Sequence, residues 1–458
     1  SPGVLVKEID LTNVVPAVST SIGAIAGAFE KGPVGEITAV SSEEDLVRIF
    51  GKPNGNNFET FFTASNFLQY GNALRVVRAQ SGVLNAMSGG SGLLIKSDTH
   101  YQDNYSAGEA SSGEWGARTA GTHGNSLGVS MCTSPEAYEE VNVTTVNEDD
   151  GSAAVGQTTV KVADGSKFNV GDIVHFGESD GQQYEVTAIN TAVLTIRRLD
   201  DASGKGIKSA ITNGAQVRRR WAFYDLFDSA PGTSTYAAGK NVSDDEMHIV
   251  VFDTTGDISG FRKDTAGERT NSVLETFAFV SQHPNAKSPQ GNANYYPDVI
   301  FRQSSFVYWL DHPSVLSNAG TVRTSGQAYA HGTGTTGEIT FALSGGTDDY
   351  AVTVGELDTA YTEFADAETV DVNLIMGGAT PAGADGTQHA TNLIDIAEAR
   401  KDVVVFISPR RADVVNIASS TTQTSNIKGF FDGLSSSSYA VFDSGFKYQF
   451  DKFNDVFR

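Results

Sequence analysis

The sequence predicts a multidomain protein with α/β and all-β parts. In this prediction a nested α/β domain, formed from both ends of the chain, surrounds inserted β-rich domains. Helix and strand patterns alternate at both ends, while short strands separated by turn residues fill the middle. The 48 glycines among 458 residues fit a chain rich in strands and loops. This length suffices for two to four domains with separate cores.

Residues 1–20 read as one extended strand. Their β-branched residues alternate with others, which is typical of a strand, and no turn pair folds the segment back on itself. A strand needs partners for its backbone N–H and C=O groups. Two alternatives stay open at this point: an edge strand of its own domain, or a strand that pairs with another molecule.

Residues 21–78 predict a β-α-α-β unit. Ser41 or Ser42 caps the first helix, three acidic residues follow in its first turn, and Gly51 ends it. We expect strands at 21–29, 37–40 and 73–78, and helices at 43–50 and 58–70.

The middle of the chain has strand patterns. A Gly- and Ser-rich stretch from residue 81 contains short strands at 93–95 and 127–131. Residues 138–220 show strands at regular spacing, which is typical of a small antiparallel barrel or sandwich. Their expected strands are 158–162, 173–176, 183–188, 194–196 and 215–219.

Strand patterns continue at 247–252 and 299–310, and residues 271–281 fit a helix or a strand equally well. An α/β pattern then returns with a helix at 356–364. A strand at 370–376, a helix at 389–400 and a strand at 403–407 follow. A strand, helix and strand within about 40 residues form a βαβ crossover, so the sheet is at least partly parallel.

These patterns divide the chain into four parts. They are an N-terminal arm (1–20), an α/β domain (21–82 plus 341–458), a β-rich domain (83–137 plus 221–340) and an inserted β-barrel domain (138–220).

The charge and cysteine content limit the partners. The net charge is −23, and phosphate contacts need clustered Lys and Arg, so we expect no direct binding of nucleic acid. Cys132 is the only cysteine, which excludes an intramolecular disulfide and a four-sulfur zinc site. The sequence has no run of 18 apolar residues and no signal-peptide pattern. We therefore expect no direct membrane contact, and synthesis in a cytoplasm.

Two glycine-rich motifs are weak candidates for a cofactor site. Residues 332–337 (GTGTTG) match a dinucleotide fingerprint, but a loop precedes them and a strand-like segment follows. Gly377 and Gly378 lie between a strand and a helix, which keeps a phosphate site there as an alternative. We expect no cofactor.

No catalytic or metal site is predicted either. The eight histidines lack the spacing of metal ligands, and no nucleophile elbow is present. Cys132 follows a strand pattern, as a buried small apolar residue does. The basic run Arg218, Arg219 and Arg220 is interpreted as a solvated strand end, with contact to an acidic face of a neighbouring molecule as the alternative.

Motifs near both ends of the chain resemble contractile phage tail sheath proteins, in particular those of T4-like myoviruses. The resemblance covers both ends and the α/β part, and does not include the 138–220 insertion. The motifs are Ser1-Pro-Gly-Val4, Lys7-Glu-Ile-Asp10, Val14-Val-Pro16, Ser19-Thr-Ser21, Glu30-Lys-Gly-Pro-Val34, Phe50-Gly-Lys-Pro53, Leu74-Arg-Val-Val-Arg78, Gly124-Asn-Ser-Leu127, Leu343-Ser-Gly-Gly-Thr-Asp348, Ser408-Pro-Arg410 and Phe442-Asp-Ser-Gly-Phe-Lys-Tyr-Gln-Phe-Asp-Lys-Phe-Asn-Asp455.

This resemblance implies a structural protein rather than an enzyme. Sheath subunits polymerise around a tail tube and contract to drive the tube through the host envelope for genome delivery. It implies an inward α/β domain, outward insertions, and a location in the virion tail after synthesis in the host cytoplasm. The implied partners are other sheath subunits, the tail tube protein, and the baseplate and tail terminator proteins. The residues expected in the inter-subunit arm are Val4, Val6, Ile9, Val14 and Val15.

One departure from the family pattern concerns the last residues. Family chains usually continue past the motif at 443–455 into a further domain, whereas this chain ends at Arg458. We therefore expect the sheet that receives the arm to be missing here, and this chain alone to be monomeric. Three alternatives remain: a sheath of a phage-related contractile injection system, an α/β enzyme with a site near Gly377, and a host-binding module built on the β-rich insertion.

Overall fold

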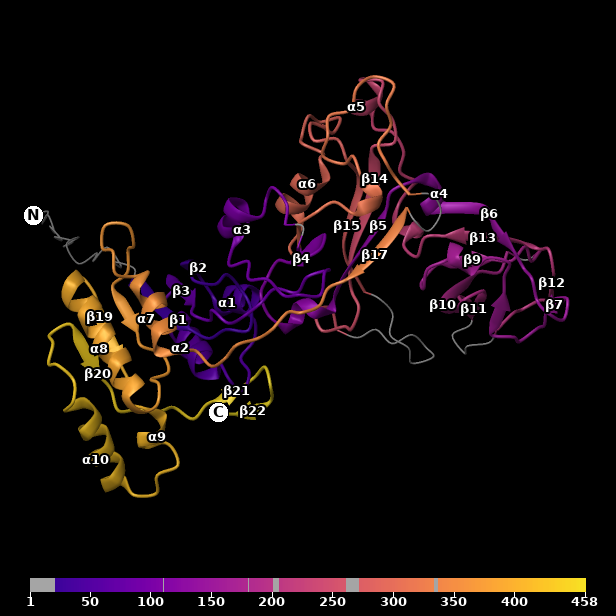
Figure 1. Cartoon of the computed structure of the whole chain (residues 1–458). Helices are drawn as coiled ribbons and strands as arrows, with labels where there is room; N and C mark the ends of the chain where they lie inside the picture. The colour runs from indigo at the N-terminus through magenta and orange to yellow at the C-terminus, as the bar shows by residue number, and fades with distance from the viewer. Residues whose placement is uncertain (1–20, 110, 180, 201–205, 261–271, 333–336) are drawn as a thin grey trace, which may run out of the picture. The chain divides into compact units, whose positions relative to one another are not determined.

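The chain forms two compact units, each of which folds around its own sheets (Figure 1). The computed structural model describes residues 21–109, 111–179, 181–200, 206–260, 272–332 and 337–458. One unit comprises Ser1–Val83 and Asp348–Arg458, and the other comprises Leu84–Thr347. Within the described ranges, no helix combines the length and apolar character needed to cross a bilayer.

Both ends of the chain contribute strands to one six-stranded sheet, as predicted. Its order is β2-β3-β1-β18-β19-β20, in which β2 is antiparallel to β3 and the other pairs are parallel. The strands are β1 (Gly23–Gly27), β2 (Thr38–Val40), β3 (Leu74–Arg78), β18 (Leu374–Met376), β19 (Val404–Ile407) and β20 (Ala440–Phe442).

Helices cover both faces of this sheet. The first helix is capped by Ser42, which is one of the two caps predicted. The Ser42 side chain accepts a hydrogen bond from the backbone N–H of Asp45 at 3.1 Å. Thr353 and Glu356 form a complete capping box at α7. The helices are α1 (Glu43–Phe50), α2 (Phe58–Leu68), α7 (Val354–Thr362), α8 (Gly383–Arg400), α9 (Arg411–Val414) and α10 (Ser420–Phe431).

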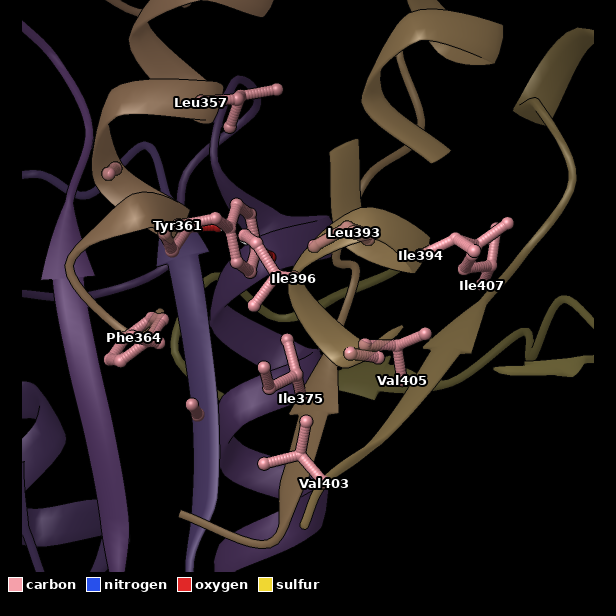
Figure 2. Packing of buried hydrophobic residues seen from close by; sticks show 14 of the residues in the cluster. Leu357, Tyr361, Phe364, Ile375, Leu393, Ile394, Ile396, Val403, Val405 and Ile407 are labelled. Atoms are coloured by element: carbon pink, nitrogen blue, oxygen red, sulfur yellow. Dashed lines mark hydrogen bonds between the residues drawn. The ribbon is translucent and has the colours of Figure 1, made fainter. Parts of the chain in front are cut away.

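Alternation along β1 explains the two cores of this unit. Ile25 packs with α1 and α2, while Ala24 and Ala26 face α7 and α8, because successive strand residues point to opposite faces. Figure 2 shows the second core, where Ile375 lies among buried leucine, isoleucine and valine side chains. The Tyr361 hydroxyl donates to the Met376 carbonyl at 2.7 Å and so fastens α7 to the sheet.

The second unit contains an antiparallel four-stranded sheet with the order β15-β14-β5-β17. Its strands are β5 (Leu127–Cys132), β14 (Glu246–Asp253), β15 (Ser272–Ser281) and β17 (Glu338–Ala342). Elements around this sheet are α3 (Asp98–Asn104), α4 (Pro135–Tyr138), α5 (Thr235–Ala238), α6 (Tyr296–Gln303), the paired strands β4 (Trp115–Ala117) and β16 (Val307–Trp309), and short 3₁₀ helices at Thr122–Ser126, Tyr224–Leu226 and Ser314–Leu316.

Residues 139–220 are called the insertion below. They form a second antiparallel sheet of this unit, which has six strands in the order β6-β13-β9-β10-β11-β8. Its edge strands meet at one isolated bridge between Val146 and Val162, so the sheet curls as predicted but its ladder does not close continuously into a barrel. The insertion contains β6 (Glu139–Thr145), β7 (Ser152–Ala153), β8 (Thr159–Lys161), β9 (Ile173–His175), β10 (Tyr184–Asn190), β11 (Val193–Arg198), β12 (Ile211–Thr212), β13 (Gln216–Arg220) and a 3₁₀ turn at Gly165–Lys167.

Two strand predictions in the second unit are wrong. In residues 93–95 only Leu93 pairs, through a single bridge to Asn85. The apolar run 299–310 is split between α6 and β16. Pro297 lies in the first turn of α6, where proline is favoured, and the apolar residues Val299 and Ile300 form part of the buried face of this helix. A short apolar run can form either the buried face of a helix or a buried strand, so the sequence does not distinguish the two.

Other boundaries and elements differ from the prediction in both units. Only the last three residues of the predicted strand 370–376 pair in the sheet. Helix α8 begins at Gly383, six residues before the predicted start. The undecided segment 271–281 forms strand β15, and the chain also forms α3 and α10, for which no prediction was made.

Replacing Ile375 by alanine tests the importance of the sheet core. Ile375 is completely buried, so Ile375→Ala should lower the free energy of unfolding by about 2–5 kcal/mol in a urea titration. The control Val441→Ala removes a 42% exposed side chain in the edge strand β20 and should cost less than about 0.5 kcal/mol. Equal effects of the two substitutions would contradict this assignment of the core.

Candidate assembly surfaces

The predicted arm residues Val4, Val6, Ile9, Val14 and Val15 lie outside the described residues, so their role stays a prediction. The described part of the first unit does show open strand edges. There, β2 pairs only with β3, and β20 pairs only with β19. An open edge presents unpaired N–H and C=O groups that can pair with another strand.

The open side of β20 can be assigned to particular backbone groups. The carbonyl of Tyr439 and the N–H of Asp443 bond to β19. Because bonding directions alternate along a strand, the backbone groups of Ala440 and Phe442 point to the open side. The Phe442 ring stacks on Phe431 of α10 with centroids 4.7 Å apart, which holds this edge strand against the helix.

A second surface is an aromatic patch at the C-terminal hairpin, which is formed by β21 (Phe450–Asp451) and β22 (Val456–Phe457). Tyr448 is 77% exposed and Phe457 is 60% exposed, and their rings stack at 5.4 Å. A contiguous exposed apolar patch is typical of an interaction site, whereas isolated exposed residues are ordinary. The aromatic patch comprises Tyr448, Phe450 and Phe457, whose rings contact one another, together with the exposed Phe446 nearby in sequence.

The buried carboxylate of Asp451 holds this hairpin in shape. It accepts hydrogen bonds from Asn454 Nδ2 and Arg458 Nε, both at 2.8 Å, and from the backbone N–H of Phe453 at 3.0 Å. Burial raises the pKa of Asp451, but the hydrogen bonds from Asn454 and Arg458 outweigh it and lower the pKa below its ordinary value.

Side chains also join the hairpin to the N-terminal part of the same unit. Asn454 donates to the carbonyl of Pro53 at 2.7 Å, and the ring of Phe453 meets the edge of Phe61 at 5.6 Å. Lys452 forms an ion pair with Glu43. The aromatic patch therefore rests on a base that packing, hydrogen bonds and an ion pair keep in place.

A cavity of about 610 Å³ lies beside the aromatic patch, between α2 and the segments that follow β18, β19 and β20. Ligands of α/β sheets often bind at the carboxyl ends of the strands, and Gly378 lines this cavity. However, Arg411 is paired with Glu59 at 3.2 Å and Arg458 with Asp451 at 2.8 Å, so their charges are compensated. The phosphate alternative at Gly377 and Gly378 gains no support from this geometry.

The remaining sequence candidates show packing roles. Residues 333–336 of the glycine-rich motif lie outside the described residues, and strand β17 rather than a helix follows at Glu338. Cys132 is completely buried at the end of β5, as expected, and burial raises the pKa of its thiol. His248 stacks on Phe227 at 4.1 Å, and burial lowers its pKa to about 4. The described residues hold no cluster of three His, Cys, Asp or Glu side chains suited to a metal ion.

The prediction of a solvated strand end at residues 218–220 is wrong for the central arginine. Arg219 has no exposed surface, and its Nη1 lies 2.8 Å from Glu338 Oε2. Arg218 and Arg220 are only partly exposed, and both pair with Glu139 at 3.0 and 2.9 Å. The acidic partners of these three arginines therefore include carboxylates of the same chain.

Comparison with known proteins adds an independent observation. Residues 20–79 match the family described as "Tail sheath protein Gp18 domain III N-terminal region". The tail sheath protein of Vibrio phage KVP40 is 28% identical over 99% of this chain and 71% of its own length, and that of Enterobacteria phage T4 is 27% identical over 100% and 70%. The predicted resemblance to phage tail sheath proteins is therefore confirmed over nearly the whole chain.

Proteins of lower identity are also similar to this chain. The tail sheath protein of Salmonella phage ViI is 24% identical over 95% of this chain and 64% of its own length. Sheath tail proteins of known structure from Listeria innocua and Desulfitobacterium hafniense align with TM-scores of 0.35 and 0.32 at 10% identity, and cover 87% and 90% of this chain. The chain spans about half the length of those two structures, 49% and 54%.

From the sequence, the C-terminal motif was used only as evidence of resemblance to sheath proteins. The aromatic patch that this motif forms was not predicted. A signal was present, because Phe446, Tyr448 and Phe450 recur at every second residue. That period places aromatic side chains on one side of an extended segment.

The lowered pKa of Asp451 predicts a local dependence on acid. Its hydrogen bonds stabilise the hairpin fully above the ordinary aspartate pKa of 3.8, and this contribution is lost as the pH falls through the lowered value. Amides of residues 449–458 should therefore lose protection from hydrogen exchange in acid before the sheet core does. In Asp451→Asn this acid-dependent loss should be absent. A control, Asp455→Asn, changes an exposed carboxylate of the same hairpin and should leave the loss unchanged.

Proposed function

We propose that this chain forms a contractile tail sheath, which polymerises around the tail tube and drives the tube through the host envelope for genome delivery. One observation carries the proposal: two tail sheath proteins align over essentially the entire chain. The subunit would be made in the host cytoplasm and reside in the virion tail. Its partners would be other sheath subunits, the tube protein, and the baseplate and tail terminator proteins, with a structural rather than enzymatic role.

The linking arm is the part of this proposal that can be tested most directly. We infer that residues 1–20 add a strand to a sheet of a neighbouring subunit, because the segment has strand periodicity and no turn of its own. Backbone hydrogen bonds of an added strand would persist while rigid domains rotate during contraction. Val4, Val6, Ile9, Val14 and Val15 would supply its apolar contacts.

Deleting residues 1–18 from the full-length protein should abolish long hollow polymers in negative-stain micrographs, with unchanged circular dichroism. The double substitution Val4→Asp and Val6→Asp should do the same, because it places charge on one face of the strand. Lys7→Ala is the control and should polymerise normally. Polymers of normal length from the deletion would refute the arm hypothesis.

The aromatic patch offers a second contact for assembly. Replacing Tyr448 and Phe457 by serine should weaken polymerisation at least several-fold, because exposed aromatic surfaces contribute most when another protein covers them. Tyr70→Ser is a matched control, since Tyr70 is 93% exposed and lies outside the patch. The critical concentration for polymer formation, measured by sedimentation, is the readout. An unchanged value in the double variant would show that the patch is not a contact between sheath subunits.

A further inference from the structure

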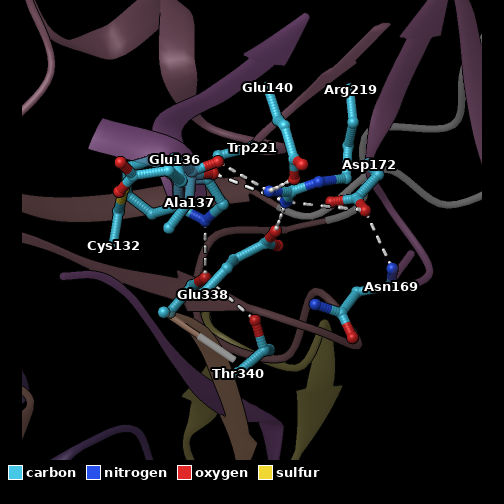
Figure 3. Close-up of polar contacts among 12 residues, drawn as sticks. Cys132, Glu136, Ala137, Glu140, Asn169, Asp172, Arg219, Trp221, Glu338 and Thr340 are labelled. Atoms are coloured by element: carbon cyan, nitrogen blue, oxygen red, sulfur yellow. Dashed lines mark hydrogen bonds and ion pairs between the residues drawn. The ribbon is translucent and has the colours of Figure 1, made fainter. Parts of the chain in front are cut away.

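The insertion is joined to the four-stranded sheet by an ionic cluster, defined here as the buried Arg219, Asp172 and Glu338 with the partly exposed Glu140 (Figure 3). Arg219 Nη1 donates to Glu338 Oε2 at 2.8 Å and lies 3.9 Å from Asp172 Oδ2. Its Nη2 donates to the Glu136 carbonyl at 2.8 Å and lies 3.9 Å from Glu140 Oε2. Asp172, Arg219 and Glu140 come from the insertion, whereas Glu338 is the first residue of β17.

The cluster contains more carboxyl groups than its single guanidinium can neutralise. The side chains of Asp172 and Glu338 are both buried, and both lie near the same nitrogen, Arg219 Nη1, at 3.9 and 2.8 Å. Two buried carboxylates this close together would repel each other without solvent screening unless one of them carried a proton. The arrangement therefore indicates a pair that shares one proton beside Arg219.

Glu338 is the group that holds this proton. Burial raises its pKa well above the ordinary value, and the charge of Asp172 raises it further. Burial also raises the pKa of Asp172, but the charge of Arg219 opposes this effect. The charged or titratable groups that face Glu338 are Arg219 of β13, Asp172 before β9, Glu140 of β6 and Cys132 of β5.

The covalent connection of the insertion resembles a hinge. The chain enters the insertion at Glu139 and leaves it at Arg220, and these two residues are directly paired across β6 and β13. Two adjacent crossings leave rotation about them possible. Asp172, 33 residues after the entry, lies at the same Arg219 nitrogen as Glu338 and so provides a third point of attachment.

We propose that the Asp172–Glu338 carboxyl pair and Arg219 form a proton-linked latch, which fixes the insertion on strand β17 and releases it to turn about the hinge at Glu139 and Arg220 when the proton is lost. The latch belongs to the fold of this chain and does not depend on the proposed sheath function. Because Glu338 binds its proton more tightly in the closed state, the closed state is favoured most below the ordinary glutamate pKa of 4.5. That preference is lost as the pH rises through the raised pKa.

Cys132 allows the latch to be observed in the intact chain. It is the only cysteine, it is completely buried, and it is paired with Glu338 in the β5–β17 register. It also packs with Ala137 and Trp221 at the base of the insertion. Opening at this base should expose its thiol to a small maleimide. The labelling rate of the unfolded chain divided by that of the native chain at the same pH gives a protection factor in which the thiolate fraction cancels.

The protection factor of the wild type should fall by up to about tenfold per pH unit above pH 4.5, until the raised pKa of Glu338 is passed. Glu338→Gln keeps the size of the side chain and a donor for Asp172 but cannot ionise, so its protection factor should be independent of pH in this range. Glu139→Gln is the matched control, because Glu139 is partly exposed at the same base, and it should keep the wild-type slope. A wild-type slope in Glu338→Gln would overturn the latch.

Hydrogen exchange distinguishes hinge motion from unfolding. When the pH is raised, amides in peptides at the base of the insertion (136–142 and 216–222) should exchange faster, by more than the intrinsic rise of the exchange rate with pH. Peptides of the β10–β11 hairpin, residues 184–198, should stay protected because their ladder lies within the insertion, which turns as one body. Simultaneous loss of protection in both sets would show that the insertion unfolds instead of turning, and would overturn the proposal.

Discussion

The pairing of β1 with both β3 and β18 is the constraint on which the first unit depends. Gly23 lies opposite Leu74 on one side and Leu374 on the other, so β1 joins segments separated by 300 residues of sequence. Position 23 requires glycine, because an added Cβ at Gly23 would lie 2.6 Å from the Phe67 ring. The closeness of α2 to β1 thus follows from glycine at this position, and the remaining strands of the parallel sheet extend from this centre.

Both units bury charged groups, but with different partners. In the first unit the buried Arg78 donates to the neutral side chain of Gln80 at 2.8 Å and to the Gly32 carbonyl at 3.1 Å. The second unit buries an arginine and two carboxyl groups where the insertion meets its sheet. Buried ionic groups contribute less to net stability than a well-packed apolar contact, because desolvation offsets their attraction. Their geometric and protonation requirements can instead determine how the sheet of the insertion is placed on the four-stranded sheet.

Sequence patterns predicted the elements whose periodicity was long or whose ends carried clear signals. The helix at α1 was found because a serine cap, acidic first turn and terminal glycine agree with its apolar side. The run 299–310 was misassigned because its apolar residues serve α6 in the first half and β16 in the second. Neither a cap nor a period within the run marks that change. For the arm, sequence provided the only information, whereas the aromatic patch became visible once the hairpin at residues 450–457 was in place.

The sequence by itself determined the α/β class, the nesting of β-rich material between the two ends, and the resemblance to tail sheath proteins. These properties depend on local periodicity and on motifs that are contiguous in the chain. Only the tertiary structure decided that Arg219 is buried, that it meets Asp172 and Glu338, and that β2 and β20 form the open edges of the described sheet. Each of these facts depends on which distant segments become neighbours. A basic run has the same sequence pattern whether water or a buried carboxylate surrounds it.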